Sequence, residues 1–286
     1  MIPANNQWQC RDRSLDLSKP VVMGVLNITP DSFSDGGRFD ERGAALSHAR
    51  RMIEEGAAII DIGGESTRPG ASPAEAGQEM DRVLPLIEKL RGESGVFISV
   101  DTSKAEVMKA AVAAGADIIN DVRALQEPGA LDAAAVSGAG ICLMHMQGEP
   151  RTMQDAPHYA DVVVEVSTFL AARIRACREN GVESARLVID PGFGFGKRVA
   201  HNLELLGKLA SLEALGVPIA VGLSRKSMLA SLTGRDVNDR LAGSVALAAV
   251  AVLHGARIVR AHDVAATVDA VRVAAAVIRE NPSGEQ

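Results

Sequence analysis

The stretch VFISVDTSKAEVMKAAVAAGADIINDV, residues 96–122, contains one complete unit of the fold. A short run rich in Val and Ile (96–102) leads into a helical segment that ends in glycine (104–115), and a second apolar run (117–122) follows. Such runs are largely apolar instead of alternating, which is typical of parallel strands buried on both faces. Glycine after a helical segment is a common stop signal. The stretch therefore predicts a β-α-β unit of a parallel sheet.

The same alternation extends outward in both directions. Strands are expected over residues 21–29, 58–64, 96–102, 117–122, 140–146, 186–192, 218–224 and 257–263. The longer helical segments cover residues 41–56, 74–92, 104–115, 161–181, 202–216, 239–255 and 264–280. Repeated strand-then-helix units form either a closed barrel or an open doubly wound sheet, and eight is the number that closes a (β/α)8 TIM barrel. We therefore predict an α/β fold of the TIM-barrel type.

The barrel is expected to form a single domain over residues 21–280. Residues 1–20 are predicted to form an N-terminal segment or hairpin that covers the barrel floor, and residues 281–286 a C-terminal tail. The length of 286 residues suits this fold, which typically takes about 250. Aromatic residues make up only 3% of the chain, so Ala, Val, Ile and Leu must fill the core.

Composition excludes several classes of protein. A net charge of −6 argues against a general nucleic-acid binder, although a local basic pocket is still possible. The three cysteines, Cys10, Cys142 and Cys177, form no CxxC pair, which argues against a disulfide framework or zinc site and fits a reducing compartment. The N-terminus is polar, and the longest apolar run (241–253) is shorter than the ~20 residues of a membrane helix. We expect a cytoplasmic protein.

Polar residues follow every predicted strand. In chain order they are Asn27, residues 65–68, Asp101, Asn120 with Asp121, His145, Asp190, residues 224–227, and Arg260 with His262 and Asp263. TIM-barrel active sites lie at the carboxyl ends of the strands, so these side chains are expected around one barrel mouth. The polar stretch TPDSFSDGGRFDE (29–41) is expected to form a loop over the same face.

The polar residues divide into two chemical sets. The first suits an anion such as pyrophosphate, because Arg pairs with two oxygens at once and Lys supplies a point charge. It consists of Arg68, Lys226, Arg260 and His262. The second suits a flat heterocycle with ring N–H and amino groups, and its carboxylates would stabilise positive charge on the ring. It consists of Asp101, Asn120 and Asp190.

Familiar catalytic motifs are absent from the sequence. GFGFGK (192–197) is similar to a P-loop, but that motif requires Gly where Pro191 stands and Ser or Thr where Arg198 stands. No GxGxxG, HExxH or GxSxG pattern occurs. Nucleotide binding through these motifs, zinc peptidase chemistry and serine hydrolysis are therefore not supported.

Eight blocks of sequence resemble the signature blocks of the dihydropteroate synthase family, whose members are pterin-binding TIM barrels. They are MGVLNITPDSFSDGG (23–37), DIGGESTRPG (61–70), SVDTSK (99–104), IINDV (118–122), MHMQGEPRTMQ (144–154), DPGFGFGK (190–197), GLSRKSM (222–228) and RAHDV (260–264). The resemblance implies an enzyme of folate biosynthesis. It would condense 6-hydroxymethyl-7,8-dihydropterin pyrophosphate with p-aminobenzoate to give 7,8-dihydropteroate and pyrophosphate. The enzyme would use Mg2+ as cofactor and would form a homodimer.

The resemblance also implies a role for each matching residue. The pterin would be bound by Asp101, Asn120, Met144, Asp190, Phe195 and Lys226. The pyrophosphate would be bound by Asn27, Thr67, Arg68, Arg260 and His262, with Asn27 also a ligand of Mg2+. Ser227 would hold the carboxylate of p-aminobenzoate. The catalytic residues would be Asp101, Asp190, Lys226 and Arg260, and the loops Thr29–Gly37 and Ser66–Gly70 would close over the site. Ala261 and Arg198 depart from the family pattern, at positions not expected to touch the reaction centre.

Mechanism and alternatives follow from these assignments. An electron-rich dihydropterin favours an SN1-like path in which pyrophosphate leaves before the amine attacks. A pterin-binding methyltransferase of the same barrel type has no need of Arg68 and Arg260, and a catalytically silent paralogue would be expected to lack some site residues. His145 is interpreted as a core histidine. The apolar helix at 241–253 is equally consistent with a subunit interface and with burial against the barrel.

Overall fold

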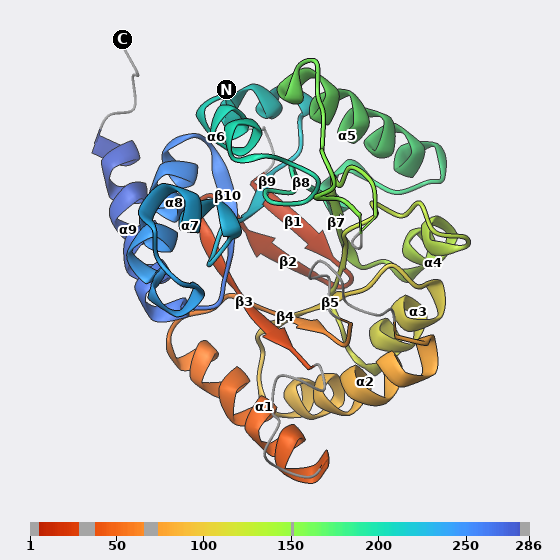
Figure 1. Ribbon diagram of the computed structural model, residues 1–286. Coiled ribbons are helices and arrows are strands. Elements are labelled where there is room, and N and C mark those ends of the chain that lie inside the picture. Colours follow the sequence, from red (N-terminus) through yellow and green to blue (C-terminus); the bar gives the residue numbers. More distant parts are fainter. Residues whose placement is uncertain (1–5, 29–37, 66–73, 150–151, 281–286) are drawn as a thin grey trace.

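Eight parallel strands close into a barrel in the order β10-β3-β4-β5-β6-β7-β8-β9 (Figure 1). The computed structural model describes residues 6–28, 38–65, 74–149 and 152–280. The strands are β3 (Val21–Asn27), β4 (Ile59–Gly63), β5 (Phe97–Asp101), β6 (Ile118–Asp121), β7 (Gly140–Met144), β8 (Leu187–Asp190), β9 (Ile219–Gly222) and β10 (Ala256–Ala261). Each one lies within a stretch expected from the sequence, apart from Ala256 at the start of β10. The predicted TIM barrel is confirmed.

Helices surround the barrel on its outer side (Figure 1). The α-helices are α1 (Arg38–Glu54), α2 (Ala76–Glu93), α3 (Ala105–Ala114), α4 (Ala130–Ser137), α5 (Val162–Glu179), α6 (Val199–Gly207), α7 (Ser227–Thr233), α8 (Leu241–Leu253) and α9 (Val264–Glu280). The described residues also form three 3₁₀ turns, η1 (Ser184–Arg186), η2 (Leu209–Leu215) and η3 (Val237–Asp239). No helix within the described ranges is long and apolar enough to cross a membrane.

Three differences from the expected helices have physical reasons. Helix α4, ALDAAAVS, is short, and its buried side chains are all alanine, so no series of large buried apolar residues marks a helical period. Helix α7 has only seven residues and follows a polar stretch. The single helix expected over 202–216 is instead α6 followed by the 3₁₀ turn η2.

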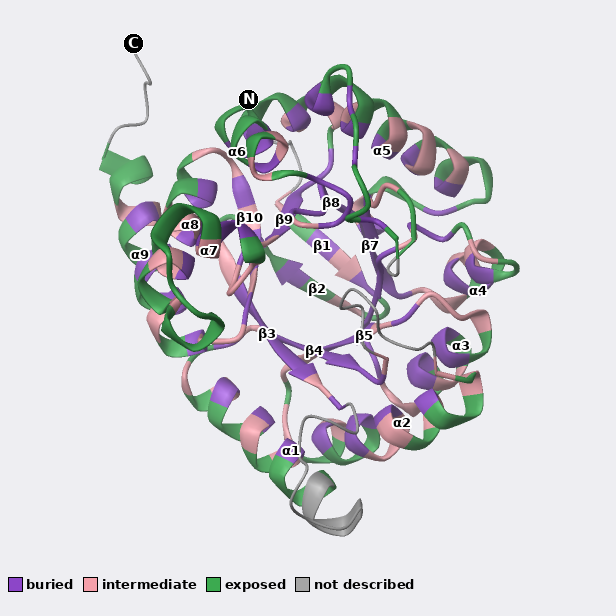
Figure 2. Cartoon of the chain, viewed as in Figure 1, coloured by how far each residue is buried: buried purple, intermediate pink, exposed green. Residues whose placement is uncertain are grey.

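Each strand divides its residues between two cores. Residues that point outward, such as Ile60 and Ile62 of β4, join the large core under the helices. Residues that point inward, such as Met23 and Ile59, belong to a smaller core inside the barrel. The burial colouring in Figure 2 accordingly shows the strands as mostly buried and the outer faces of the helices as exposed. This alternation determines which residues reach the interior of the barrel.

An antiparallel hairpin closes one end of the barrel. It consists of β1 (Gln7–Cys10) and β2 (Arg13–Asp16) and appears in Figure 1 across the centre of the ring of strands. Trp8 and Leu17 are fully buried against inward-pointing residues at the amino ends of the strands. The indole Nε1 of Trp8 donates to the carbonyl of Arg186 at 2.9 Å. The hairpin predicted at the barrel floor is therefore present, and the open mouth lies at the carboxyl ends of the strands.

Candidate active site

The last inward-pointing residues of the strands meet at the barrel mouth. The strand register aligns Asn27 with Gly63, Gly63 with Asp101, and Asp101 with Asn120. On the other side of the barrel it aligns Met144 with Asp190 and Gly222 with Arg260. Polar residues that are far apart in the sequence are thus brought to one end of the barrel because each ends its own strand.

A small cavity of about 20 Å³ lies at this mouth. Its lining includes all six residues predicted for the pterin together with Arg260: Asp101, Asn120, Met144, Asp190, Phe195, Lys226 and Arg260. The remaining lining residues are Val122, Gly192, Phe193 and Gly222. This volume holds about one water, so a heterocycle must displace side chains in order to enter.

Arg260 lies at the centre of the polar groups. Its Nε donates to Oδ2 of Asp61 at 2.6 Å, and its Nη2 donates to Oδ2 of Asp101 at 2.8 Å. The side-chain amide of Asn120 donates to the same oxygen of Asp61 at 3.1 Å. Asp61 is fully buried, and its Oδ1 has no hydrogen-bond partner among the described residues. Arg260 is therefore held between two carboxylates.

Sequence reasoning missed Asp61. It stands in the middle of β4, IIDIG, whereas the residues predicted to be functional lie at or after the strand ends. A charged residue inside a run buried on both faces is itself a signal, because a buried charge requires a partner. Here the partner is Arg260, and Asp61 supports the site from one layer below the mouth.

Burial sets the ionisation of the groups that line the cavity. It raises the pKa of Asp101 to about 7; the charge of Arg260 opposes this rise and that of Asp61 adds to it. Burial likewise raises the pKa of Asp190, against the hydrogen bond from the backbone of Gly192. Burial and the nearby Arg260 lower the pKa of Lys226 to about 8. Groups that titrate near neutrality in a cleft are typical of an active site.

One wall of the cavity is apolar. Met144 and Phe195 pack with Val122 and Met153 in a small buried cluster. The ammonium of Lys226 lies 4.0 Å from the centre of the Phe195 ring, which is the geometry of a cation–π contact. A flat ring with polar edges would meet this apolar wall on its face and the carboxylates at its edge.

Residues predicted for the pyrophosphate are only partly described. Asn27 lies beside Gly63, where an added Cβ would be 3.1 Å from the Asn27 Oδ1. The Nδ1 of His262 lies 3.1 Å from the Ser224 hydroxyl, and burial followed by the charge of Arg260 lowers the pKa of His262 to about 4. Thr67 and Arg68 lie outside the described residues, as do the predicted loops Thr29–Gly37 and Ser66–Gly70.

Ser227, predicted for p-aminobenzoate, is the exposed first residue of α7, directly after Lys226.

Magnesium suits the chemistry of Asn27. Mg2+ prefers oxygen ligands and is commonly held by one or two protein groups together with substrate phosphates. The Asn27 amide oxygen, at the mouth end of β3, is such a ligand. Over the described ranges no cluster of three or more His, Cys, Asp or Glu side chains could hold a metal by itself. A metal at this mouth would thus depend on the substrate for most of its ligands.

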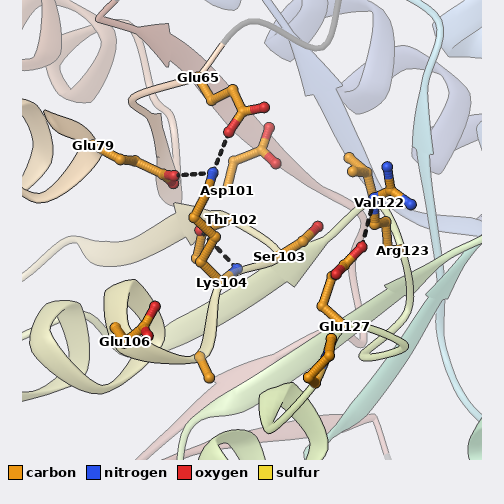
Figure 3. Close-up of a pocket in the computed structure, with 12 residues that line it drawn as sticks. Glu65, Glu79, Asp101, Thr102, Ser103, Lys104, Glu106, Val122, Arg123 and Glu127 are labelled. Atoms are coloured by element: carbon orange, nitrogen blue, oxygen red, sulfur yellow. Dashed lines mark hydrogen bonds and ion pairs between the residues drawn. The ribbon is translucent and has the colours of Figure 1, made fainter. Parts of the chain in front are cut away.

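A second, larger cavity adjoins the first (Figure 3). Its volume is about 340 Å³, and Asp101 lines both cavities. Figure 3 shows Lys104 between Glu65 and Glu79, with which it forms ion pairs, the one to Glu79 at 2.7 Å. These charges are already engaged with each other, and no aromatic side chain of the described residues lines the cavity. It therefore suits a heterocycle less well than the barrel mouth.

Comparisons with known proteins identify the family of this chain. Residues 23–262 match the sequence model of the family described as pterin binding enzyme. The dihydropteroate synthase of Escherichia coli is 51% identical over 265 residues, which cover 93% of this chain and 94% of that protein. The enzyme of Haemophilus influenzae is 50% identical over 262 residues, covering 92% and 95%.

Solved structures give the same result. Yersinia pestis dihydropteroate synthase, in a complex with a sulfonamide drug, superposes with a TM-score of 0.91 at 49% identity, covering 96% of this chain and 99% of that one. The Xanthomonas albilineans enzyme in complex with 7,8-dihydropteroate superposes with a TM-score of 0.87 at 50% identity, covering 95% and 98%. The chain therefore belongs to the pterin-binding enzyme family and, within it, to the dihydropteroate synthases.

Proposed function

We propose that this chain condenses 6-hydroxymethyl-7,8-dihydropterin pyrophosphate with p-aminobenzoate to give 7,8-dihydropteroate and pyrophosphate. The observation that carries the proposal is the cavity at the barrel mouth, where two carboxylates, an amide and two cations converge on an apolar wall. The two relatives described above are synthases about half identical to the chain over more than nine-tenths of its length. That similarity favours synthesis over the methyltransferase and the silent paralogue.

The pterin would lie against Phe195 and Met144, with its ring N–H and amino groups donating to Asp101 and Asp190. Asn120 would offer an amide to a neighbouring ring position, and Lys226 would donate to a ring acceptor. All of these residues line one cavity, which supports this placement. Burial raises the pKa values of Asp101 and Asp190, and hydrogen bonds from the ring N–H and amino groups would lower them again by stabilising the charged carboxylates.

The reaction would begin with cleavage of the bond between the CH2 carbon and the bridging oxygen. The electron pair of that bond leaves with pyrophosphate, and the positive charge spreads into the dihydropterin ring. Asp101 and Asp190 would stabilise this cation, and a preorganised group of this kind contributes about 3 kcal/mol to a transition state. The lone pair of the aryl amine then forms the new C–N bond, and the amine proton passes to solvent. The amine is neutral at pH 7 and requires no strong base.

The leaving pyrophosphate would be received by Asn27, Thr67, Arg68, Arg260 and His262. Mg2+, held by Asn27 and the phosphate oxygens, would neutralise part of the charge on the leaving group. Arg260 can contribute because its planar guanidinium offers five donors, of which Asp61 and Asp101 engage two. His262, whose pKa is lowered to about 4, would act as a neutral N–H donor.

p-Aminobenzoate would place its carboxylate near Ser227, which is exposed beside Lys226. The Yersinia pestis relative forms a complex with a sulfonamide drug. Sulfonamides carry the same aryl amine as p-aminobenzoate, so we expect them to compete for this position here.

A homodimer in the cytoplasm completes the proposal. Helices α8 and α9 pack against each other on the outside of the barrel (Figure 1). Together they expose six large apolar side chains: Leu241, Val250, Leu253, Val273, Val277 and Ile278. A patch of this kind is typical of a protein interface, and the three free cysteines suit a reducing compartment. Sedimentation of the Val273→Glu variant as a monomer, with the unmodified protein as a dimer, would support this interface.

The proposed activity is tested by mixing the pure protein with pterin pyrophosphate, p-aminobenzoate and Mg2+. We expect release of pyrophosphate and formation of 7,8-dihydropteroate in equal amounts, with both lost when any one component is omitted. The Asp190→Asn variant is compared with the unmodified protein. If the variant forms no 7,8-dihydropteroate while the unmodified protein does, the activity depends on the barrel mouth. Hydrolysis of the pterin pyrophosphate without incorporation of p-aminobenzoate would reject the proposal.

A further inference from the structure

A buried lysine supports the loop that follows β8. Lys197 is 3% exposed, and its ammonium donates to three acceptors. These are the carbonyls of Gly192 and Phe195, at 2.9 and 3.2 Å, and the Nδ1 of His145 at 2.9 Å. A lysine ammonium has three N–H groups, so this geometry uses all of them. Within the described parts of the chain no carboxylate forms an ion pair with Lys197.

The ring of His145 is the third partner of the Lys197 amino group. Burial lowers the pKa of Lys197 to about 7. In its ammonium form Lys197 can only donate, so the Nδ1 of His145 accepts and the ring is the neutral tautomer protonated at Nε2. Burial, with the charge of Lys197 as a second cause, lowers the pKa of His145 to about 3. The ring also packs edge-on against Phe169, 4.9 Å between centroids, which fixes its position.

The loop held by this lysine lies directly against the chain after β7. Gly192 and Gly196 have positive φ values of 69° and 60°. A Cβ at Gly192 would lie 1.8 Å from the carbonyl oxygen of His145, and one at Gly196 would lie 2.3 Å from that of Gln147. No other residue type fits these approaches, so the backbone of the loop has one closely specified path.

The same loop forms part of the candidate pterin pocket. Its residue Phe195 provides the apolar wall and the contact with the Lys226 ammonium. The backbone N–H of Gly192 donates to Oδ1 of Asp190 at 2.7 Å, which orients that carboxylate. Lys197 itself is not among the residues that line the cavity. Its effect on the pocket must therefore pass through the carbonyls of Gly192 and Phe195.

We infer that Lys197 is a positioning residue for the pterin pocket: by joining the carbonyls of Gly192 and Phe195 to the His145 ring, it fixes the Phe195 wall and the Asp190 carboxylate for the heterocycle. This inference rests on the proposed function, because it assumes that the pocket receives a pterin. It assigns Lys197 and His145 to the pterin end of the site and predicts no direct effect on p-aminobenzoate.

The test is the Lys197→Met variant, which keeps a side chain of similar length without charge or donors. Binding of 6-hydroxymethyl-7,8-dihydropterin is measured by calorimetry, and the KM of p-aminobenzoate is measured at saturating pterin pyrophosphate. Lys208→Met is the matched control, since Lys208 is an exposed lysine paired with Glu204 on α6. We expect Lys197→Met to raise the pterin dissociation constant tenfold or more, with the p-aminobenzoate KM and the Lys208→Met protein each within twofold of the unmodified values.

A second pair of variants tests the acceptor. His145→Asn retains an oxygen close to the position of Nδ1, whereas His145→Leu does not, and we expect tenfold weaker pterin binding in the leucine variant with at least partial recovery in the asparagine variant. These two decide the question if Lys197→Met does not fold. Pterin affinity within threefold of the unmodified protein in Lys197→Met, or equal losses in the two His145 variants, would overturn the inference. Failure of the unmodified protein to bind the pterin would instead reject the proposed function.

Discussion

The guanidinium of Arg260 is bound to the carboxylate of Asp101, with 2.8 Å between Nη2 and Oδ2. The two residues were predicted for different halves of one substrate, Arg260 for the pyrophosphate and Asp101 for the pterin. The two side chains form an ion pair, and the Nε of the same guanidinium donates to Asp61. A pterin pyrophosphate would contact both members of this pair at once. Under the proposed function, this ion pair would couple recognition of the ring to recognition of the leaving group.

Replacement of Asp101 by Asn should remove the charge that stabilises the pterin cation while keeping the shape of the side chain. We expect kcat to fall about 100-fold, the usual effect of removing one preorganised electrostatic group. Thermal unfolding should stay close to that of the unmodified protein. Steady-state pyrophosphate release measures the effect, with Asp269→Asn on the exposed face of α9 as the control. A near-normal rate in the Asp101 variant would remove the carboxylate from the mechanism.

The rate should depend on pH in a bell-shaped manner. Below a pKa of about 7 the Asp101 carboxyl becomes protonated and loses the charge that the pterin requires, so kcat/KM falls toward acid. Above a pKa of about 8 Lys226 loses its proton, so kcat/KM falls toward alkali.

A pH profile of kcat/KM for the pterin substrate checks both limbs. Lys226→Arg carries a cation that does not titrate in this range, so its profile should lose the alkaline limb and keep the acidic one. A profile that is flat from pH 5.5 to pH 9 in the unmodified protein would contradict the assigned ionisations.

Replacement of Asp61 by Ala should destabilise the protein. The substitution leaves the mostly buried Arg260 without one of its two carboxylates and the Asn120 amide without its acceptor. Removal of one partner from a buried ion pair costs about 3 kcal/mol or more. Urea unfolding measures the loss, and the Asp61→Asn variant, which keeps an acceptor oxygen, should lose less. Equal stabilities for the alanine variant and the unmodified protein would show that Asp61 does not support Arg260.

Replacement of Trp8 by Ala should affect stability without affecting the site. The indole is fully buried at the barrel floor, so its removal is expected to cost about 3–5 kcal/mol. The proposed pterin pocket lies at the opposite end of the barrel. We therefore expect the dissociation constant of the pterin to stay within twofold of the value for the unmodified protein. Chemical unfolding and calorimetry measure the two quantities, with Trp8→Phe as the milder control. Weak pterin binding in a stable variant would mean that the floor and the mouth are not independent.

The fold could be predicted because its signals are local. Each strand is a short apolar run, and several of the helices that follow end in glycine, as at Gly115, where φ is 116°. Helices α4 and α7 were not predicted, because a short alanine-rich or polar segment shows little helical periodicity of apolar residues. The path of the chain after α6 depends on tertiary packing, which turned an expected continuous helix into α6 and η2.

The site could be predicted only in part. Asp101, Asp190 and Arg260 were identified because polar residues follow all eight predicted strands, whose ends converge on one barrel mouth. Their pairing could not be foreseen, since Arg260 is 199 residues from Asp61 and 159 from Asp101, and only closure of the barrel brings them together. Lys197 looked like part of a failed P-loop, and its three acceptors became apparent only from the folded loop.

We propose that the cavity inside the barrel mouth receives the pterin. A crystal structure of the protein with 6-hydroxymethyl-7,8-dihydropterin tests this placement. We expect a heterocycle against Phe195, within hydrogen-bond distance of Asp101, Asn120 and Asp190, with the Lys226 ammonium displaced from its place over the Phe195 ring. A heterocycle bound instead in the larger neighbouring cavity, between Lys104 and Arg123, would contradict it.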